Sequence, residues 1–418
     1  MWKRNFPHVR EWSTGLRVRH INLFFALVFS LVGAVIIAGS AAWFLAPRLN
    51  VGTQPTPPAD LTRLSLTIAA GVGGVVFLVV AYRRQRDLEQ GRFVEGFGAA
   101  AKQLGDADVA VRLAGVYAMA GVADQTSKLK RQQCIDVLCG YLRLPYSPEL
   151  GNNHQSALIL KRPVRRKPGS EEELRFQYRQ NDKEVRQTIV RVIVAHLHRK
   201  SARPWSSNDF DFTGSHLEEP NFRGATFNGT NTSFDQATFS GTDTSFDQAT
   251  FSGTDTSFYG ATFSGTDTSF DGATFSGTDT SFEGATFNGT DTWFDGATFN
   301  GTTTSFNGAT FNGTTTWFDE ATFNGTTTSF NGATFNGTDT SFDEATFSGA
   351  TTSFDEATFS GADTSFKGVD FGLGRVTFRN PRAWNPAPTF DWGPGSGAES
   401  SKPANVEPPD WPPSEQHG

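Results

Sequence analysis

Phenylalanine recurs through the second half of the chain with a strict period. Between about Phe210 and Phe378 the unit A-T-F-x-G-T-x-T-S-F-x-x repeats every 12 residues, and the spacing between successive phenylalanines alternates between five and seven. A short fixed period indicates one structural unit stacked many times, so the pattern predicts a solenoid over residues 205–379. Its predicted inward-facing core ladder begins with Phe222, Phe227, Phe234, Phe239, Phe246, Phe251, Phe258, Phe263, Phe270, Phe275, Phe282, Phe287, Phe294 and Phe299.

Each five-residue piece of the repeat, A-T-F-x-G or T-S-F-x-x, carries a small residue two positions before its phenylalanine. In an extended segment, residues two apart point to the same side, so both face the interior while the residues between them face water. Glycine two positions after phenylalanine suits a corner that requires a positive φ. The repeat therefore predicts short β-strands joined by tight corners.

The length of one coil follows from volume and from longer repeats. A 12-residue coil would hold two phenylalanines in each layer. There is no room for them, because layers lie about 4.8 Å apart and facing backbones about 10 Å apart. A 24-residue coil gives four faces with one phenylalanine each. Trp293 and Trp317 are separated by two repeat units, as are the N-G corners at Asn307 and Asn331. We therefore predict a 24-residue coil, in which Phe270 stacks on the phenylalanines two repeat units away.

The start of the array shows spacings of five without insertion, at Phe212, Leu217, Phe222 and Phe227, in D-F-T-G, S-H-L-E-E, P-N-F-R-G and A-T-F-N-G. At these residues the chain resembles the pentapeptide-repeat family. The resemblance implies a right-handed quadrilateral β-helix with four pentapeptides per coil. The seven-residue spacings in the array depart from that pattern.

The N-terminal segment 1–82 has the pattern of a membrane anchor. A basic segment, 1–20, precedes an apolar run at 21–46, a short proline-rich loop at 47–63 and a second apolar run at 64–82. Both runs are long enough to span a bilayer, and the first is too long for a typical signal peptide. Arginine and lysine crowd the outer flanks of the pair, so we expect a multi-pass protein of the bacterial inner (plasma) membrane with both termini in the cytoplasm.

Residues 83–204 have a helical pattern, interrupted by an expected loop at 144–172 that carries the basic cluster K-R-P-V-R-R-K. Asp106 or Asp108 can cap a helix. Cys134 and Cys139 lie on different parts of another expected helix, so we expect both to be free, buried thiols. The stretches 111–120, 134–143 and 184–197 look like the HEAT-like helical module of bacterial membrane-anchored pentapeptide-repeat proteins. Residues 380–418 are rich in Pro, Gly and Ser and are expected to be a disordered tail, apart from Trp384, which can cover the last coil. The expected fold class is thus α+β and multidomain: two transmembrane helices, a small α-helical bundle, the β-helix and this tail.

Charge divides the chain into two halves. Residues 208–379 hold 23 acidic and four basic residues, a net charge of −19, whereas residues 1–207 carry +15. The acidic residues include a ladder formed by Asp243, Asp255, Asp267, Asp279 and Asp291. The ladder is a possible interaction surface, or simply a solvated outer face that keeps the rod soluble. The basic cluster 161–166 can attract anionic lipid, or is simply a solvated loop.

No catalytic or metal-binding motif emerges from the sequence. The seven histidines lack metal-ligand spacing, and neither a nucleophile elbow nor a phosphate-binding loop is present. We therefore expect a non-enzymatic protein with no cofactor, no metal and no small-molecule substrate. The N-G-T sequons are attributed to the repeat composition.

Three functions compete. The first is a membrane-tethered scaffold that presents the rod to an unidentified protein partner, with no direct binding of nucleic acid. The second is an acidic mimic of DNA, as in the quinolone-resistance pentapeptide proteins that resemble this rod and engage DNA gyrase. The third is a threonine-rich ice-binding solenoid, because T-x-T recurs in each repeat, as at Thr242 and Thr244.

Overall fold

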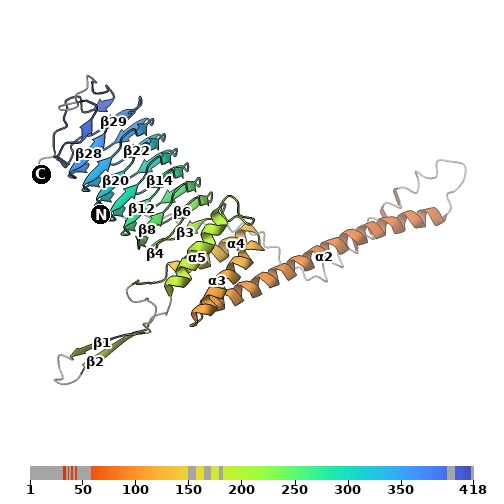
Figure 1. Cartoon of the computed structure of the whole chain (residues 1–418). Coiled ribbons are helices and arrows are strands. Elements are labelled where there is room, and N and C mark those ends of the chain that lie inside the picture. Colours follow the sequence, from red (N-terminus) through yellow and green to blue (C-terminus); the bar gives the residue numbers. More distant parts are fainter. Residues whose placement is uncertain are drawn as a thin grey trace. The chain divides into compact units, whose positions relative to one another are not determined.

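The computed structural model describes residues 32, 33, 36, 39, 40, 43, 44, 58–148, 157–163, 171–177, 182–392 and 401–415. The chain divides into two compact units, residues 1–94 and 95–418. The second unit holds three helices and a long β-solenoid (Figure 1).

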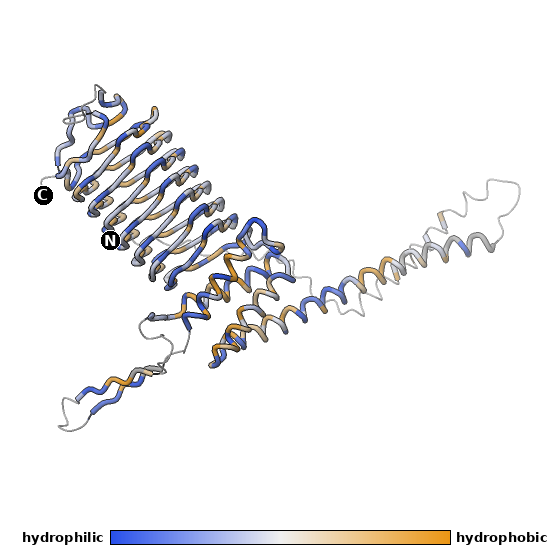
Figure 2. Tube along the Cα trace, in the orientation of Figure 1, coloured by the Kyte–Doolittle hydropathy of each residue, from blue (hydrophilic) through white to orange (hydrophobic). Residues whose placement is uncertain are grey.

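The long helix α2 (Pro58–Leu104) carries an apolar stretch followed by a hydrophilic one, visible along the tube in Figure 2. The expected span 64–82 lies within this helix, and the expected span 21–46 falls largely outside the described residues. No helix in the described part of the chain is both long and apolar enough to cross a membrane. The structure thus does not show the two expected spans, and membrane attachment stays a prediction from the sequence.

Three helices of the second unit form the expected helical module: α3 (Val109–Asp124), α4 (Lys128–Leu142) and α5 (Asp182–Leu197). Of the two expected candidates, Asp106 and Asp108, it is Asp108 that caps α3, accepting a hydrogen bond of 2.8 Å from the backbone N–H of Ala110. Cys134 and Cys139 are free and buried, and burial raises the pKa of Cys134 to about 11. Both thiols therefore belong to the apolar core of the module.

The expectation of a loop over 144–172 is wrong for part of that segment. Strands β1 (Ala157–Pro163) and β2 (Glu171–Gln177) pair antiparallel. The register places Lys161 opposite Glu173 and Arg162 opposite Glu172, so cross-strand pairs of opposite charge favour a hairpin. The remaining residues of the basic cluster, 164–167, lie outside the described residues.

The solenoid is a right-handed type of β-helix with four parallel ladders along its length. One ladder has nine strands: β3 (Phe210–Asp211), β6 (Asn231–Ser233), β10 (Asp255–Ser257), β14 (Asp279–Ser281), β18 (Thr303–Ser305), β22 (Thr327–Ser329), β26 (Thr351–Ser353), β29 (Arg375–Thr377) and β32 (Val406–Glu407). The second, with seven strands, comprises β8 (Asp243–Ser245), β12 (Asp267–Ser269), β16 (Asp291–Trp293), β20 (Thr315–Trp317), β24 (Asp339–Ser341), β28 (Asp363–Phe366) and β31 (Thr389–Phe390).

The other two ladders consist mostly of two-residue strands. One has eight members: β4 (His216–Glu218), β7 (Thr238–Ser240), β11 (Thr262–Phe263), β15 (Thr286–Phe287), β19 (Thr310–Phe311), β23 (Thr334–Phe335), β27 (Thr358–Phe359) and β30 (Ala383–Trp384). The last has six: β5 (Thr226–Phe227), β9 (Thr250–Phe251), β13 (Thr274–Phe275), β17 (Thr298–Phe299), β21 (Thr322–Phe323) and β25 (Thr346–Phe347).

The register confirms the 24-residue coil. Asp255 pairs with Asp279, and Trp293 pairs with Trp317. The ring of Phe270 lies 4.9 Å from that of Phe246 and 4.7 Å from that of Phe294, nearly parallel to both. Successive 12-residue units therefore occupy different faces of the rod, and each phenylalanine continues a column of its own.

The four columns of phenylalanine meet in the middle of the rod and fill it. Phe270 contacts Phe258 and Phe282 of the facing column edge to face, at 5.6 and 5.5 Å. All three rings are fully buried, as is the alanine two residues before every A-T-F phenylalanine. Because edge-to-face and offset stacking are both favourable for aromatic rings, one residue type supplies the whole core.

Glycine has two different roles at the corners, and only one of them matches the expectation. After T-S-F, Gly272 has φ +59°, and Gln248 and Glu320 adopt the same left-handed conformation at equivalent positions. After A-T-F, Gly277 has no positive φ; instead, a Cβ added to it would lie 2.1 Å from the carbonyl oxygen of Gly253 in the previous coil. From Gly277 onward the second type of corner therefore excludes every side chain, which explains why it is glycine in those coils, whereas Gly241 in an early coil has a positive φ.

Both ends of the phenylalanine columns are covered. At the start, α4 and α5 pack against β3 and β4. At the other end, Trp384 and Phe390 extend two columns, and Trp411 lies edge-on to Phe390 at 5.1 Å. The expectation of a disordered tail over 380–418 is therefore wrong for the described residues up to Trp392 and for 401–415, because the last aromatic layer would otherwise face water.

Candidate interaction surfaces of the solenoid

The predicted acidic ladder forms two rows on different faces of the rod. Asp243, Asp267 and Asp291 are paired in register in one row, and Asp255 pairs with Asp279 in the other. Burial and the like charge of Asp291 and Asp243 raise the pKa of Asp267. These carboxylates lie at the outer edge of the strands, where they are accessible to a partner.

A third acidic row was not identified from the sequence. It consists of the residue after each phenylalanine of one column, one per coil: Asp247, Asp271, Asp295, Asp319 and Asp343. Arg223 precedes this row and lies 3.7 Å from Asp247, and Lys367 follows it. The sequence does contain a signal for this row. Residues one 24-residue coil apart lie on the same face, and these aspartates recur at that spacing.

Serine hydroxyls normally support these carboxylates. The hydroxyl of Ser269 donates to Asp247, and that of Ser341 donates to Asp319. The two equivalent serines in between are replaced by Trp293 and Trp317, which cannot make that bond. As a result, one buried oxygen each of Asp271 and Asp295 has no hydrogen-bond partner among the described residues.

The two carboxylates that lack a serine donor, Asp271 and Asp295, also have raised pKa values. Burial, followed by the like charges of Asp271 and Asp319, raises the pKa of Asp295 to about 7. Burial and Asp247 likewise raise the pKa of Asp271. The two tryptophans next to them are partly accessible, and Trp317 is 38% exposed. The middle of this face is therefore the one place where exposed aromatic rings and poorly satisfied carboxylates occur together among the described coils.

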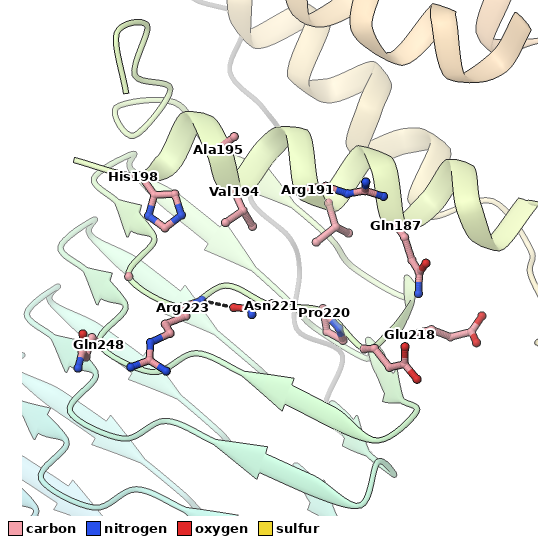
Figure 3. A pocket seen from close by; sticks show the side chains of 13 residues that line it. Gln187, Arg191, Val194, Ala195, His198, Glu218, Pro220, Asn221, Arg223 and Gln248 are labelled. Carbon is pink, nitrogen blue, oxygen red and sulfur yellow. Dashed lines mark hydrogen bonds between the residues drawn. The ribbon is translucent and has the colours of Figure 1, made fainter. Parts of the chain in front are cut away.

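A groove of about 760 Å³ lies between α5 and the first coil. Its walls are apolar at Val190, Val194 and Pro220 and charged at the rim, with Arg191 and Arg223 among the lining residues. Figure 3 shows Val194 of α5 pointing toward the solenoid across it. Its mixed charges do not indicate a particular ligand.

A buried polar cluster fixes the helical module to the solenoid. Arg186 donates hydrogen bonds to the carbonyls of Tyr141, at 3.3 Å, and of His216, at 3.2 Å. Asp182 lies 3.8 Å from Arg186 and accepts a hydrogen bond of 2.6 Å from the Tyr141 hydroxyl. Burial lowers the pKa of Arg186. Since these groups are enclosed and bond mainly to one another and to backbone carbonyls, the cluster is a structural junction.

Two further features bear on the competing functions. The two threonines of each T-x-T do not share an outer face: Thr254 is exposed, whereas Thr256 is buried. This arrangement weighs against a flat threonine surface that binds ice. Among the described residues, no group of three or more His, Cys, Asp or Glu side chains is placed to hold a metal ion.

Comparison with known protein families identifies the repeat. A model described as pentapeptide repeats (9 copies) matches residues 212–262 and 306–358. No curated protein and no solved structure matches the chain. The chain therefore contains pentapeptide repeats that form a β-solenoid.

Proposed function

We propose that this pentapeptide-repeat solenoid is a non-enzymatic, membrane-tethered scaffold that binds a basic protein partner along its acidic faces. The observation that carries the proposal is the alignment of carboxylates by the register of the coils. Between Arg223 and Lys367 the rod has no Lys, Arg or His, so its faces there carry only negative charge. Such a surface attracts a positively charged partner over several ångströms and orients it before contact.

The tether rests on the sequence of the N-terminal segment 1–82. The apolar runs 21–46 and 64–82, flanked by basic residues, favour two spans in the inner membrane with the rod in the cytoplasm. Reporter fusions at positions 55 and 400 of the full chain should then report opposite sides of the membrane. A fusion at 400 that reports the external side would refute this orientation.

The rod itself is tested by capture of its partner. A photo-crosslinking amino acid placed at Asp267, on an acidic row, should capture a basic protein from solubilised membranes, identified by mass spectrometry. The same group placed at Leu373, which is fully exposed beyond the acidic middle of the rod, is the control. Failure to capture any protein at Asp267 above the level of that control would contradict the scaffold.

Mimicry of DNA is the second candidate, and charge density favours it. The eight strands of one ladder that lie within residues 208–379, from β3 to β29, make a rod of roughly 34 Å at about 4.8 Å a step. The net charge of −19 over the same residues then gives one charge per roughly 1.8 Å, against about 1.7 Å for duplex DNA. If the captured protein binds DNA, and duplex DNA displaces the rod from it, the mimic is the better description. A partner that binds rod and DNA simultaneously would exclude it.

A further inference from the structure

The outer face of the ladder β12, β16, β20 and β24 differs from every other part of the rod at two adjacent coils. The position before the column phenylalanine is Ser269, Trp293, Trp317 and Ser341 in these four strands. At the equivalent position of the opposite ladder every strand from β6 to β26 has serine. The tryptophans are therefore a local feature of one face and are not required by the coil.

The two tryptophans do not serve the core of the rod. They lie in neighbouring strands in direct register, about 4.8 Å apart along the rod. Within the described residues neither indole stacks on another aromatic ring of the core, which is complete without them. Trp317 is 38% exposed where serine would leave less apolar surface in water. Trp293 is partly accessible beside it, and a pair of accessible indoles is typical of a binding surface.

The adjacent carboxylates have unused hydrogen-bonding capacity. Asp271 and Asp295 each keep a buried oxygen with no partner among the described residues, because Trp293 and Trp317 stand where serine donates in the neighbouring coils. The two side chains as a whole stay partly accessible on this face, so a ligand that brings N–H groups can pair with the accessible side of carboxylates that lack a serine donor. The site thus offers acceptors and aromatic faces together.

The matching positive charge has to come from outside the rod. The nearest basic residues in the sequence are Arg223 and Lys367, and Arg223 already lies against Asp247. Arginine fits the site better than lysine, since its planar guanidinium forms paired hydrogen bonds with a carboxylate and stacks flat on an indole. A side chain on an extended segment can make both contacts.

We propose that the patch formed by Trp293, Trp317, Asp271 and Asp295 is the docking site for an arginine-containing segment of a partner protein. The proposal rests on the scaffold function proposed above and names the surface and the chemistry of the partner. The acidic rows attract the segment, and the tryptophan pair determines where along the rod it binds.

The probe is a fluorescein-labelled peptide of six Arg-Gly repeats, and fluorescence anisotropy measures its binding to the full-length chain at physiological salt. The variant Trp293→Ser/Trp317→Ser restores the serine of the other coils, so its fold is expected to be preserved, and it should bind at least tenfold more weakly. Asp271→Asn/Asp295→Asn should have a similar effect, and asparagine occupies the equivalent corner at Asn307. Tenfold corresponds to about 1.4 kcal/mol, within the range of one cation–π contact with a paired carboxylate.

The control variant removes the same charge from the opposite face. Asp255→Asn/Asp279→Asn should weaken binding by no more than about threefold, because it changes only the general attraction. A peptide with citrulline in place of arginine should not bind. Equal losses in the control and in Asp271→Asn/Asp295→Asn, or unchanged binding by the tryptophan variant, would overturn the proposal. So would self-association of the wild type that the tryptophan variant abolishes, since the site would then bind a second copy.

The outcomes separate this site from the scaffold function. If the peptide does not bind while crosslinking at Asp267 still captures a protein, the proposed site is wrong and the scaffold stands. If the peptide does not bind and no protein is captured, both proposals fail.

Discussion

The two kinds of glycine corner lead to opposite expectations for the same substitution. Gly277→Ala places a methyl group 2.1 Å from the carbonyl oxygen of Gly253, whereas Cβ atoms in real structures essentially never approach such an atom closer than 3.0 Å. The two coils therefore have to separate locally by about 0.9 Å. In Gly272→Ala the methyl group would lie 3.8 Å from Gln248, an ordinary contact, and only the positive φ opposes it.

The structure gives a magnitude for each variant. Separation at Gly277 would lengthen the ladder bonds from Ser276 N–H to Phe251 O, now 2.8 Å, and from Asp279 N–H to Thr254 O, now 3.0 Å, beyond hydrogen-bonding distance. Two lost bonds at roughly 1–3 kcal/mol each, less about 0.4–1 kcal/mol gained from a stiffer unfolded chain, predict a loss of about 1–5.5 kcal/mol.

For Gly272→Ala the left-handed conformation costs about 1–2 kcal/mol, and the same gain offsets part of it, so the expected loss is about 0–1.5 kcal/mol. Gln248 and Glu320 already adopt this conformation in their coils, which supports the lower value.

Hydrogen exchange followed by mass spectrometry on the full-length chain measures the effect where it occurs. Amides 276–281 should lose protection in Gly277→Ala and keep most of it in Gly272→Ala, and urea unfolding of the rod should follow the same order. Equal destabilisation by the two variants, or a greater loss in Gly272→Ala, would refute the distinction between the corners.

Three further predictions test the core, the cap and the acidic face. Phe282→Ala should cost about 3–5 kcal/mol, because Phe282 is fully buried, while Asp279→Ala should change stability by less than about half a kcal/mol; urea unfolding that ranks them in reverse would contradict the inside and outside assignment. Trp411→Ala should cost about 1–2 kcal/mol and speed proteolysis of the last coil, since its ring covers Phe378 and Phe390; unchanged proteolysis would deny it a capping role. The pKa of Asp295 is raised to about 7, so the folded chain keeps a proton on this carboxyl that the unfolded chain releases near pH 4. The melting temperature of the wild type should therefore fall relative to that of Asp295→Asn as the pH rises from about 4 to 8. Parallel pH profiles of the two proteins would count against this.

The core of the rod could be predicted from the sequence because its contacts repeat. A phenylalanine such as Phe270 meets the same residue type one coil away on either side, so periodicity and available volume were enough to determine the coil and its columns. The cap of α3 was likewise predictable to within two residues, Asp106 or Asp108, because it depends on residues close in sequence; the structure identifies Asp108.

The hairpin and the tail show the limits of that reasoning. The hairpin β1–β2 is stabilised by pairs such as Lys161 and Glu173 that no helical or turn motif reveals. Trp384 was expected to cover the last coil, but the tail is also ordered at Trp411, because the solenoid would otherwise end in a partly exposed aromatic layer that composition alone does not reveal.

The sequence by itself thus determined the repeating unit, the length of its coil and the residue type that fills it. Only the tertiary structure decided how the corners and side chains of successive coils meet. That geometry separates the crowded corner at Gly277 from the left-handed one at Gly272, and it places Trp317 where a serine would have supported Asp295. The physical reason is that close packing and hydrogen bonding act between atoms of adjacent coils, and their geometry exists only once the coils are stacked.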